Sequence, residues 1–525
     1  MTPTRRRWVL ATLSAAGVII ANSAGIAVGD DGVGYTAIAD SLSSGRGLGY
    51  FLERPVTIWP PTWPTLMSIV DRISPLGAEG AAIALNAFTA VVVVVLADLL
   101  LSRHIRSERV VWLGSSVVAL GASSMLFGHL LMTDFAFSAV VLALLLVLPG
   151  VRGDHPLRAL LGSAGLVWVG FSIRYAGIAL VASGALWLLA ERGRPFTRRL
   201  ANAAVFSGAS VIVPALWVLR NRSVDGTALG VRYSSSRGLL PNVADTLATV
   251  GNFLIPGVAI ETRSLWALIG LAGTAAVAVA ALAVAGGRPG ALAGPDGQIA
   301  SFIGSPIGLI AVHATTYLVY MVYARTTTGL NRLDFRLLNP AYLPLVALGL
   351  VIADRASALR VDPRAGRSLI GRAAPVAVVS WAVLNVAVGV GMVGWFTTDP
   401  DVFEGNYNGR SFDEARTSDA LDVIPPDCQV VSNLPNALYE AGIEATWSPR
   451  LTGLESDDTV DDLRQLERRL RAPHHRDVCL VWFDMQPRYG HLAPLETLQK
   501  TFRLVEIRDD APVRLYRVES RRAAA

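Results

Sequence analysis

Long apolar runs dominate the pattern of hydrophobic and polar positions along the chain. A membrane-spanning helix needs about 20 mainly apolar residues, and eleven segments approach or meet this requirement. They are residues 8–28, 80–101, 110–128, 132–149, 157–173, 175–190, 200–219, 264–286, 299–323, 337–353 and 374–396. Residues 59–75 are also apolar, but the three prolines of WPPTWP disfavour a spanning helix, so we expect a re-entrant or interfacial segment. The pattern predicts a mainly α-helical, polytopic membrane protein with about eleven spans.

The pattern changes after the last apolar run. Short apolar runs (VVSN, CLVWF, FRLVEI and VRLYRV) have the length and composition of strands and alternate with the more polar stretches SFDEARTSDALDVI and DDLRQLERRLR. In the second stretch Leu463, Leu466 and Leu470 recur at helical spacing among charges, which predicts one apolar stripe on a solvated helix. We therefore expect a membrane domain over residues 1–396 and a small α/β domain over residues 397–525.

The two cysteines of the chain, Cys428 and Cys479, both open strand-like runs of the second domain. Adjacent parallel strands would bring them within bonding distance. Because two cysteines alone cannot be assigned a bridge, the sequence slightly favours two buried free thiols.

Composition narrows the class of protein. The chain has 525 residues, 52% of them hydrophobic and 17% charged, against about 25% charged for a soluble domain, and its mean hydropathy is +0.45. So few charges cannot cover a soluble protein of this size, which excludes a cytosolic enzyme, a secreted domain and a disordered scaffold. Residues 1–396 carry a net charge of +12 and residues 397–525 one of −7. A basic membrane part with an acidic tail indicates topology and lipid headgroups, with no nucleic-acid partner.

The arginines set the expected orientation. If the N-terminus is placed in the cytoplasm, 18 arginines of the membrane part fall in cytoplasmic loops and 12 in outside loops, as the positive-inside rule requires. Eleven spans then place residues 397–525 outside, where cysteines can oxidise. The start also resembles a signal peptide, but its 21-residue apolar run favours an uncleaved first span. We expect a multi-pass plasma-membrane protein with a cytoplasmic N-terminus and an extracytoplasmic C-terminal domain.

The first outside loop, residues 29–79, carries the most informative chemistry. Asp30 and Asp31 follow an apolar span directly, and on their own they would be an ordinary helix end. The next apolar positions, Tyr35, Ile38, Ala39 and Leu42, have the spacing of an amphipathic helix lying along the membrane surface, and the glycine-rich residues 45–49 would end it. A carboxylate pair, a surface helix and the WPPTWP run together indicate a site that opens at the outer leaflet.

Basic residues in the outside loops are the second candidate group. By the positive-inside rule, outside loops should carry few arginines, yet they contain Arg174, Arg220, Arg232 and Arg336. Arg174 shares a tight hairpin with Tyr175. A charge at this depth usually has a partner or a ligand, and a guanidinium suits phosphate oxygens. Binding of lipid headgroups is the alternative for each arginine. Asp134 begins the fourth span, where a salt bridge to one of these arginines is favoured over a role in positioning the acceptor.

Several motifs of the chain carry a family resemblance. An apolar span, Asp with Tyr four residues on, an Ala-containing helix, SLSSGRG and WPPTWP follow one another in the first loop. Further along come LMTDFAFSAVVLALLLVL, SIRYAGIAL, PALWVLRN with GVRYSSSRGL, RLDFRLLNPAYLPL and, in the tail, PPDCQVVSNLPNALY. This order resembles the GT-C superfamily of integral-membrane glycosyltransferases, within it the protein O-mannosyltransferases, the aminoarabinose transferases and their bacterial homologues.

The resemblance implies an enzyme of cell-wall biogenesis. It would transfer a hexose or pentose from a polyprenyl-phosphate donor to an envelope glycan, lipid or protein on the extracytoplasmic face, with inversion at the anomeric carbon. The essential acid of the family lies in the first outside loop, where Asp31 matches better by its spacing to Tyr35 and Asp30 is second. Tyr35, Asp134, Arg174, Tyr175, Arg220, Arg232 and Arg336 are the expected substrate-binding residues. No spacing of metal ligands is present, so no cofactor is expected, and a divalent cation has no support from the sequence.

Two other classes of protein remain open. A transporter or flippase of lipid-linked precursors would also have many spans, but transporters tend to show inverted repeats, and no internal symmetry is visible. A non-catalytic envelope assembly protein would use the C-terminal domain as its working part. Replacing Asp30 and Asp31 separates these classes, because an enzyme loses glycan transfer whereas a scaffold tolerates the change.

Overall fold

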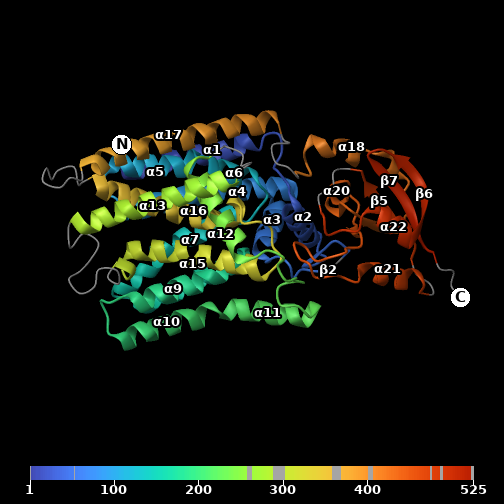
Figure 1. Ribbon diagram of the computed structural model, residues 1–525, viewed down its shortest axis with the longest axis horizontal. Coiled ribbons are helices and arrows are strands. Elements are labelled where there is room, and N and C mark those ends of the chain that lie inside the picture. Colours follow the sequence, from blue (N-terminus) through green and yellow to red (C-terminus); the bar gives the residue numbers. More distant parts are fainter. Residues whose placement is uncertain are drawn as a thin grey trace.

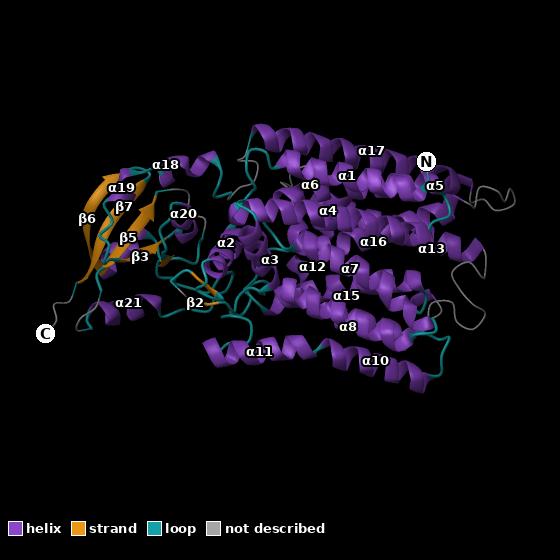
Figure 2. Ribbon diagram, turned by 180° about the vertical axis from the view of Figure 1, so that it is seen from behind, coloured by secondary structure: helices purple, strands orange, loops and turns teal. Residues whose placement is uncertain are grey.

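The protein is described here by a computed structural model, in which residues 2–52, 54–256, 263–287, 302–357, 368–399, 406–472, 476–484 and 489–521 are placed. Long helices form a bundle, and a smaller domain with a β-sheet sits at one end of it (Figure 1). The N-terminus lies at the opposite end of the bundle, on the left in Figure 1. The strands gather in the C-terminal domain, apart from a short hairpin near the bundle (Figure 2).

The bundle consists of apolar helices. They are α1 (Pro3–Ala21), α4 (Gly77–His104), α5 (Glu108–Leu120), α6 (Ala122–His129), α7 (Asp134–Val147), α8 (Pro156–Ile173), α9 (Ala179–Ala190), α10 (Phe196–Ser210), α11 (Ile212–Asp225), α12 (Leu239–Leu254), α13 (Arg263–Gly287), α15 (Pro306–Thr327), α16 (Phe335–Ser357) and α17 (Ser368–Thr398). Within the described residues, eight helical segments are long and apolar enough to cross a membrane, and Tyr175–Ala190 and Arg263–Ala278 are shorter apolar helices. Each of the eleven predicted spans contains a helix, so the polytopic α-helical fold class is confirmed.

The surface of the bundle suits a lipid environment. Large apolar side chains such as Phe88, Trp112, Leu216 and Leu219 are exposed on several of its helices, and eight helical segments of the described residues are long and apolar enough to cross a membrane. The protein is therefore a membrane protein.

Two details of the bundle differ from the sequence prediction. The first helix ends at Ala21 and not at residue 28, because the side-chain amide of Asn22 donates to the carbonyls of Val18 (2.7 Å) and Gly128 (2.9 Å) and the chain turns at residues 22–24. Helix α12 was not predicted, because polar residues between its apolar positions prevent a long apolar run in the sequence. It packs against α13 at a very close approach, where a Cβ on Gly270 would fall 1.9 Å from the Leu247 carbonyl oxygen.

Residues 29–79, the predicted first outside loop, form a layer between the bundle and the C-terminal domain (Figure 1). It contains α2 (Asp30–Ser43), the hairpin strands β1 (Gly49–Tyr50) and β2 (Arg54–Pro55), and α3 (Thr62–Ile73). Gly45 and Gly47 adopt φ values of +80° and +93° after α2, a conformation that glycine tolerates best, so this stretch ends the helix as predicted.

The prediction that α2 lies along a membrane surface was wrong. Tyr35, Ile38 and Ala39 are buried, and so is every residue from Gly32 to Ala39. The reason is that α3 packs on one side of α2 and α20 (Pro435–Glu440) of the C-terminal domain packs on another. The segment predicted to be re-entrant or interfacial forms α3, whose side chains Leu66, Ile69 and Ile73 are exposed at helical spacing.

The C-terminal domain is built on a five-stranded mixed sheet with the order β4-β3-β5-β7-β6. The strands are β3 (Gln429–Ser432), β4 (Thr446–Trp447), β5 (Val478–Phe483), β6 (Phe502–Asp510) and β7 (Val513–Ser520), and all except β4 coincide with the predicted runs. The predicted helix over residues 411–424 is broken into α18 (Asp413–Arg416) and α19 (Asp419–Asp422), because Ser418 caps a new helix start.

Both faces of this sheet are covered. Residues of β5 point alternately to the two sides, as expected for a pleated strand. On one side Leu480 packs with α21 (Asp462–Leu470) and α22 (Leu495–Thr501), and on the other Val481 belongs to the core that includes α20. The predicted α/β character of this region is confirmed, and α20 lies on the face toward the first outside loop.

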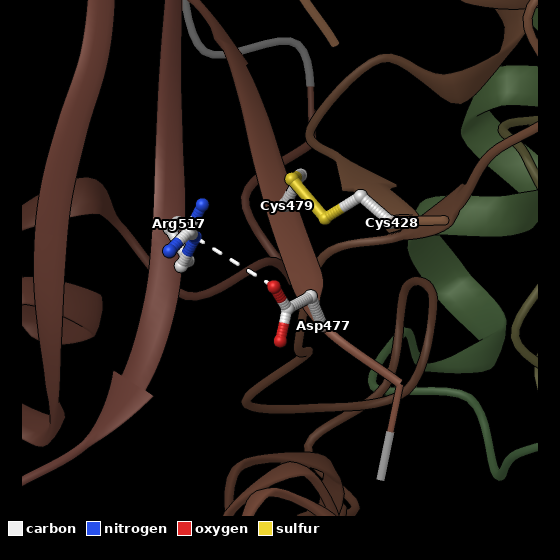
Figure 3. Close-up of a disulfide and its surroundings, with 4 residues drawn as sticks. All are labelled: Cys428, Asp477, Cys479 and Arg517. Atoms are coloured by element: carbon white, nitrogen blue, oxygen red, sulfur yellow. Dashed lines mark ion pairs between the residues drawn. A yellow bond between two sulfur atoms is a disulfide. The ribbon is translucent and has the colours of Figure 1, made fainter. Parts of the chain in front are cut away.

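A disulfide joins Cys428, just before β3, to Cys479 in β5 (Figure 3). The slight preference for two free thiols was therefore wrong. The two strands are parallel neighbours, with Val430 opposite Cys479, and this register places the Cα atoms of the two cysteines 5.8 Å apart. Sequence alone does not contain the register, which is why the bond could not be assigned from it.

Candidate functional site

The two aspartates of the first outside loop open helix α2. Asp30 and Asp31 occupy its first turn, where the partial positive charge of a helix N-terminus favours carboxylates. The preceding residues 26–28 are extended and buried. Asp30 and Asp31 therefore start a buried helix between the bundle and the C-terminal domain.

The carboxylate of Asp31 faces the bundle. Its Oδ1 accepts a hydrogen bond from Trp59 Nε1 (3.0 Å), and its Oδ2 accepts one from Arg336 Nη1 (3.1 Å). The side chain of Asp31 is nevertheless 38% exposed. Asp31 is thus held in one orientation while part of its carboxylate stays accessible.

Trp59, from the WPPTWP run, lies directly on α2. A Cβ on Gly34 would fall 2.5 Å from the indole ring, so a glycine is required for the ring to approach the helix. The ring of Tyr35 meets that of Trp59 edge-on at 6.1 Å. Burial raises the pKa of Tyr35, and the negative charge of Asp31 raises it further, so Tyr35 remains a neutral hydroxyl.

A buried ion pair lies beside this carboxylate. Asp134, at the start of α7, is fully buried, and its Oδ1 is 2.5 Å from Arg174 Nη1 at the end of α8. Asp134 also lies within electrostatic reach of Arg336 and Asp31. The structure therefore brings Asp31, Tyr35, Asp134, Arg174 and Arg336 into one cluster, and the favoured interpretation of Asp134 as the salt-bridge partner of one of the candidate arginines is confirmed.

Tyr175 and Arg220 take a different place. The Tyr175 hydroxyl donates to the carbonyl oxygen of Thr57 (2.7 Å) and accepts from Trp217 Nε1 (2.8 Å). Arg220 donates to the carbonyl oxygen of Val56, and its guanidinium lies 4.9 Å from the centre of the Trp217 ring. Both residues hold the segment that leads to Trp59, so their contacts support the loop.

Arg232 lies in the loop between α11 and α12. Its side chain is exposed, and its Nε donates to the carbonyl oxygen of Leu229 (3.2 Å). It lies within electrostatic reach of Asp31 and Tyr175. Among the described residues it forms no salt bridge with a carboxylate. The charge of Arg232 is therefore left for a ligand.

Asp30 faces the opposite way, toward the C-terminal domain. Its Oδ1 accepts hydrogen bonds from the hydroxyls of Tyr407 (2.6 Å) and Tyr489 (2.5 Å) and from Asn436 Nδ2 (2.8 Å). Sequence reasoning missed all three partners. Tyr407, in the polar run Asn-Tyr-Asn soon after the last span, gives a faint signal, but the other two lie over 400 residues from Asp30 and give none.

The segment before Asp30 is held from both sides by backbone hydrogen bonds. On one side the Ala27 amide donates to His129 and the Leu131 amide donates to Ala27, both at 2.9 Å. On the other side the Tyr407 amide donates to the Val28 carbonyl (2.8 Å). We call these three segments, residues 26–28, 129–131 and 406–408, the seam. The seam joins the start of the aspartate helix to the segment before Asp134 and to the C-terminal domain.

Within the described ranges, no group of three or more His, Cys, Asp or Glu side chains is arranged to hold a metal ion. The positive charge in contact with Asp31 is the guanidinium of Arg336.

Comparison with known proteins identifies the fold. No family model matches the sequence, and no curated protein matches it. Among solved structures, the chain is similar to ArnT from Cupriavidus metallidurans bound to undecaprenyl phosphate, with a TM-score of 0.59, 14% identity and 97% of each chain covered. The apo state of ArnT gives a TM-score of 0.57 with the same identity and coverage. The apo oligosaccharyltransferase of Archaeoglobus fulgidus gives 0.50 at 10% identity, over 91% of this chain and 69% of that one. These proteins are GT-C glycosyltransferases, and the chain has their fold.

Proposed function

We propose that this chain, which has the GT-C fold, transfers a sugar from a polyprenyl-phosphate donor to a hydroxyl group of an envelope acceptor, with Asp31 as the base. The observation that carries the proposal is the contrast between the two aspartates. Asp30 Oδ1 is occupied by three donors, whereas Asp31 is fixed by Trp59 and Arg336 and keeps 38% of its side chain exposed. A base must be both oriented and open to its substrate.

The proposed step is a displacement with inversion at the anomeric carbon. The acceptor hydroxyl passes its proton to Asp31 while its oxygen bonds to the anomeric carbon. The bond between that carbon and the phosphate oxygen breaks, and its electron pair leaves with the polyprenyl phosphate. A phosphate leaving group needs no protonation, but its growing negative charge requires compensation.

The arginines supply that compensation in our proposal. Arg336 contacts Asp31 through Nη1 alone, so its remaining N–H groups can bind the phosphate beside the base. Arg232 has no carboxylate partner among the described residues, and it lies on the same side of the site. One of the similar ArnT structures has undecaprenyl phosphate bound, a ligand of the class proposed here. Arg174, in contrast, is paired with Asp134, and we assign it to holding that buried carboxylate.

We further propose that the site faces the extracytoplasmic side. The support is the distribution of charge: α1 opens with Arg5, Arg6 and Arg7, and Arg6 pairs with Asp98 (2.8 Å) near the end of α4, the helix that also carries Arg103. By the positive-inside rule the end of the bundle that carries the N-terminus is cytoplasmic. The C-terminal domain and the aspartate helix lie at the other end.

Purified Asp31→Asn and Asp30→Asn variants test the proposal. The substrates are decaprenyl- and undecaprenyl-phosphate carrying mannose or arabinofuranose, with envelope glycan as acceptor. Asn keeps the size of Asp31 but removes the proton acceptor, and general-base catalysis contributes about 10²–10⁴-fold. We expect turnover to fall by about that factor in Asp31→Asn, with donor binding retained, and by less in Asp30→Asn. Wild-type turnover in Asp31→Asn would refute the role of Asp31. Wild-type turnover in both variants would refute the proposal that the chain is a glycosyltransferase with its catalytic base in this loop.

A further inference from the structure

The C-terminal domain contacts α2 at its first turn, next to the proposed base. One of its partners on α2 is Asp30, a charged residue adjacent to the proposed base. All three groups that bind Asp30 Oδ1 (Tyr407, Tyr489 and Asn436) come from this domain or from the segment that leads into it. Hydrogen bonds to a carboxylate are about twice as strong as those between neutral groups, so this contact fixes a defined geometry.

Each of the two tyrosines is itself held in place. The hydroxyls of Tyr407 and Tyr489 lie 3.1 Å apart. The Tyr407 ring packs on Phe412 at 5.0 Å, and the Tyr489 ring meets Trp447 edge-on at 4.9 Å. Packing against residues of their own domain therefore helps to orient both donors.

Asp30 and Asp31 are consecutive residues in the first turn of α2. A displacement of Asp30 therefore moves the backbone of Asp31 and pulls its carboxylate away from Trp59 and Arg336. Catalytic groups tolerate little displacement, since an error of about 1 Å can lower a rate about 10²-fold.

We infer that the C-terminal domain is a positioning element of the active site, in which Tyr407, Tyr489 and Asn436 bind Asp30 and thereby set the place of Asp31. The inference rests on the proposed function of Asp31. These three residues act through Asp30 and do not touch the reacting atoms. The domain thus determines the rate of the transfer step, beyond any contact that it makes with an acceptor.

The test is a double-mutant cycle in the full chain. Tyr407→Phe combined with Tyr489→Phe should lower kcat about 10–100-fold and leave the KM for the polyprenyl-phosphate sugar within about twofold. In an Asp30→Ala background the same two changes should lower kcat less than about twofold further, because their route to Asp31 is already lost. An unchanged kcat in the double Phe variant would overturn the inference. So would a further loss of kcat of about 10–100-fold when the two Phe changes are added to Asp30→Ala.

Tyr439→Phe is the matched control. Tyr439 is also a tyrosine of the C-terminal domain that donates to α2, but its partner is Asp40, near the far end of the helix. We expect its kcat to stay within about threefold of wild type. An equal loss in Tyr439→Phe and in the double Phe variant would mean that general docking of the domain matters, and would refute positioning through Asp30.

Hydrogen exchange separates this inference from the proposed function. Amides of the first turns of α2 should exchange several-fold faster in the double Phe variant than in wild type and Tyr439→Phe. If wild-type protein transfers no sugar from any donor tested, the proposed function fails while the exchange result still decides whether the C-terminal domain holds Asp30. Unchanged exchange would refute the inference independently of activity.

Discussion

Glu440 should make the contact between the two domains depend on pH. It lies at the end of α20, where it faces Glu79 of α4, Asp40 of α2 and Arg416 of α18. Within the described residues its Oε1 is buried without a hydrogen-bond partner. Burial, and next the negative charge of Glu79, raise the pKa of Glu440 from 4.5 to about 7.

The sign of the effect follows from proton linkage. Because the pKa is higher in the docked protein than in the unfolded chain, the docked state binds more protons between pH 4.5 and pH 7. The stabilisation from this proton is fully present below pH 4.5 and is lost as pH rises through 7. A difference of this size corresponds to at most about 3 kcal/mol, and partial exposure of Glu440 reduces it to about 1–2 kcal/mol.

The assay compares Glu440→Gln with wild type at pH 5 and pH 8. The urea midpoint of the C-terminal domain is measured by brief digestion with proteinase K, which is active at both values. Wild type should be about 1–2 kcal/mol less stable at pH 8 than at pH 5, and Glu440→Gln should lose most of this difference. Glu496→Gln, an exposed glutamate on α22, is the control and should behave as wild type. The same pH difference in Glu440→Gln as in wild type would refute the reasoning.

Three further predictions concern other parts of the molecule. Replacing Cys428 and Cys479 by alanine should lower the free energy of unfolding of the C-terminal domain by up to about 4 kcal/mol, since the bond closes a separation of 51 residues; equal urea midpoints would contradict this. Arg232→Ala should weaken binding of undecaprenyl phosphate by about 1.5–3 kcal/mol, measured by calorimetry in detergent, with lysine rescuing only in part; Arg222→Ala, also exposed, should bind normally, and equal losses in both variants would indicate general attraction of charge. Alkaline phosphatase fused after Thr398 should be active if the C-terminal domain is outside, and an inactive fusion would reverse the orientation.

The membrane part could be predicted from the sequence because its signal is local. A run of about 20 apolar residues needs no knowledge of its neighbours, and the same holds for the strands of the tail. The prediction for α2 failed for the converse reason. Its apolar spacing fits a helix on a surface, and only the arrival of α3 and α20 makes that helix buried. Local periodicity predicts the helix but not what covers it.

The candidate site was predictable in its residue types and only partly in its pairings. Arg336 was singled out because charges next to membrane spans require partners, and the two aspartates because a predicted helix and the WPPTWP run follow them. Nothing in the sequence pairs Arg336 with Asp31 across 305 residues, or Asp30 with Tyr489 across 459. These contacts depend on the packing of the whole bundle and on the docking of a second domain.

The seam sets the order in which this protein can be completed during synthesis. Residues 26–28 and 129–131 are among the first parts of the chain to be made, and they can pair as soon as the early helices are inserted. Residues 406–408 follow only after the last membrane helix. A nascent chain that has all its membrane helices therefore still lacks one edge of the seam and every donor to Asp30. Folding of the C-terminal domain is thus the final step of assembly, and a truncated chain retains its aspartates without the contacts that place them.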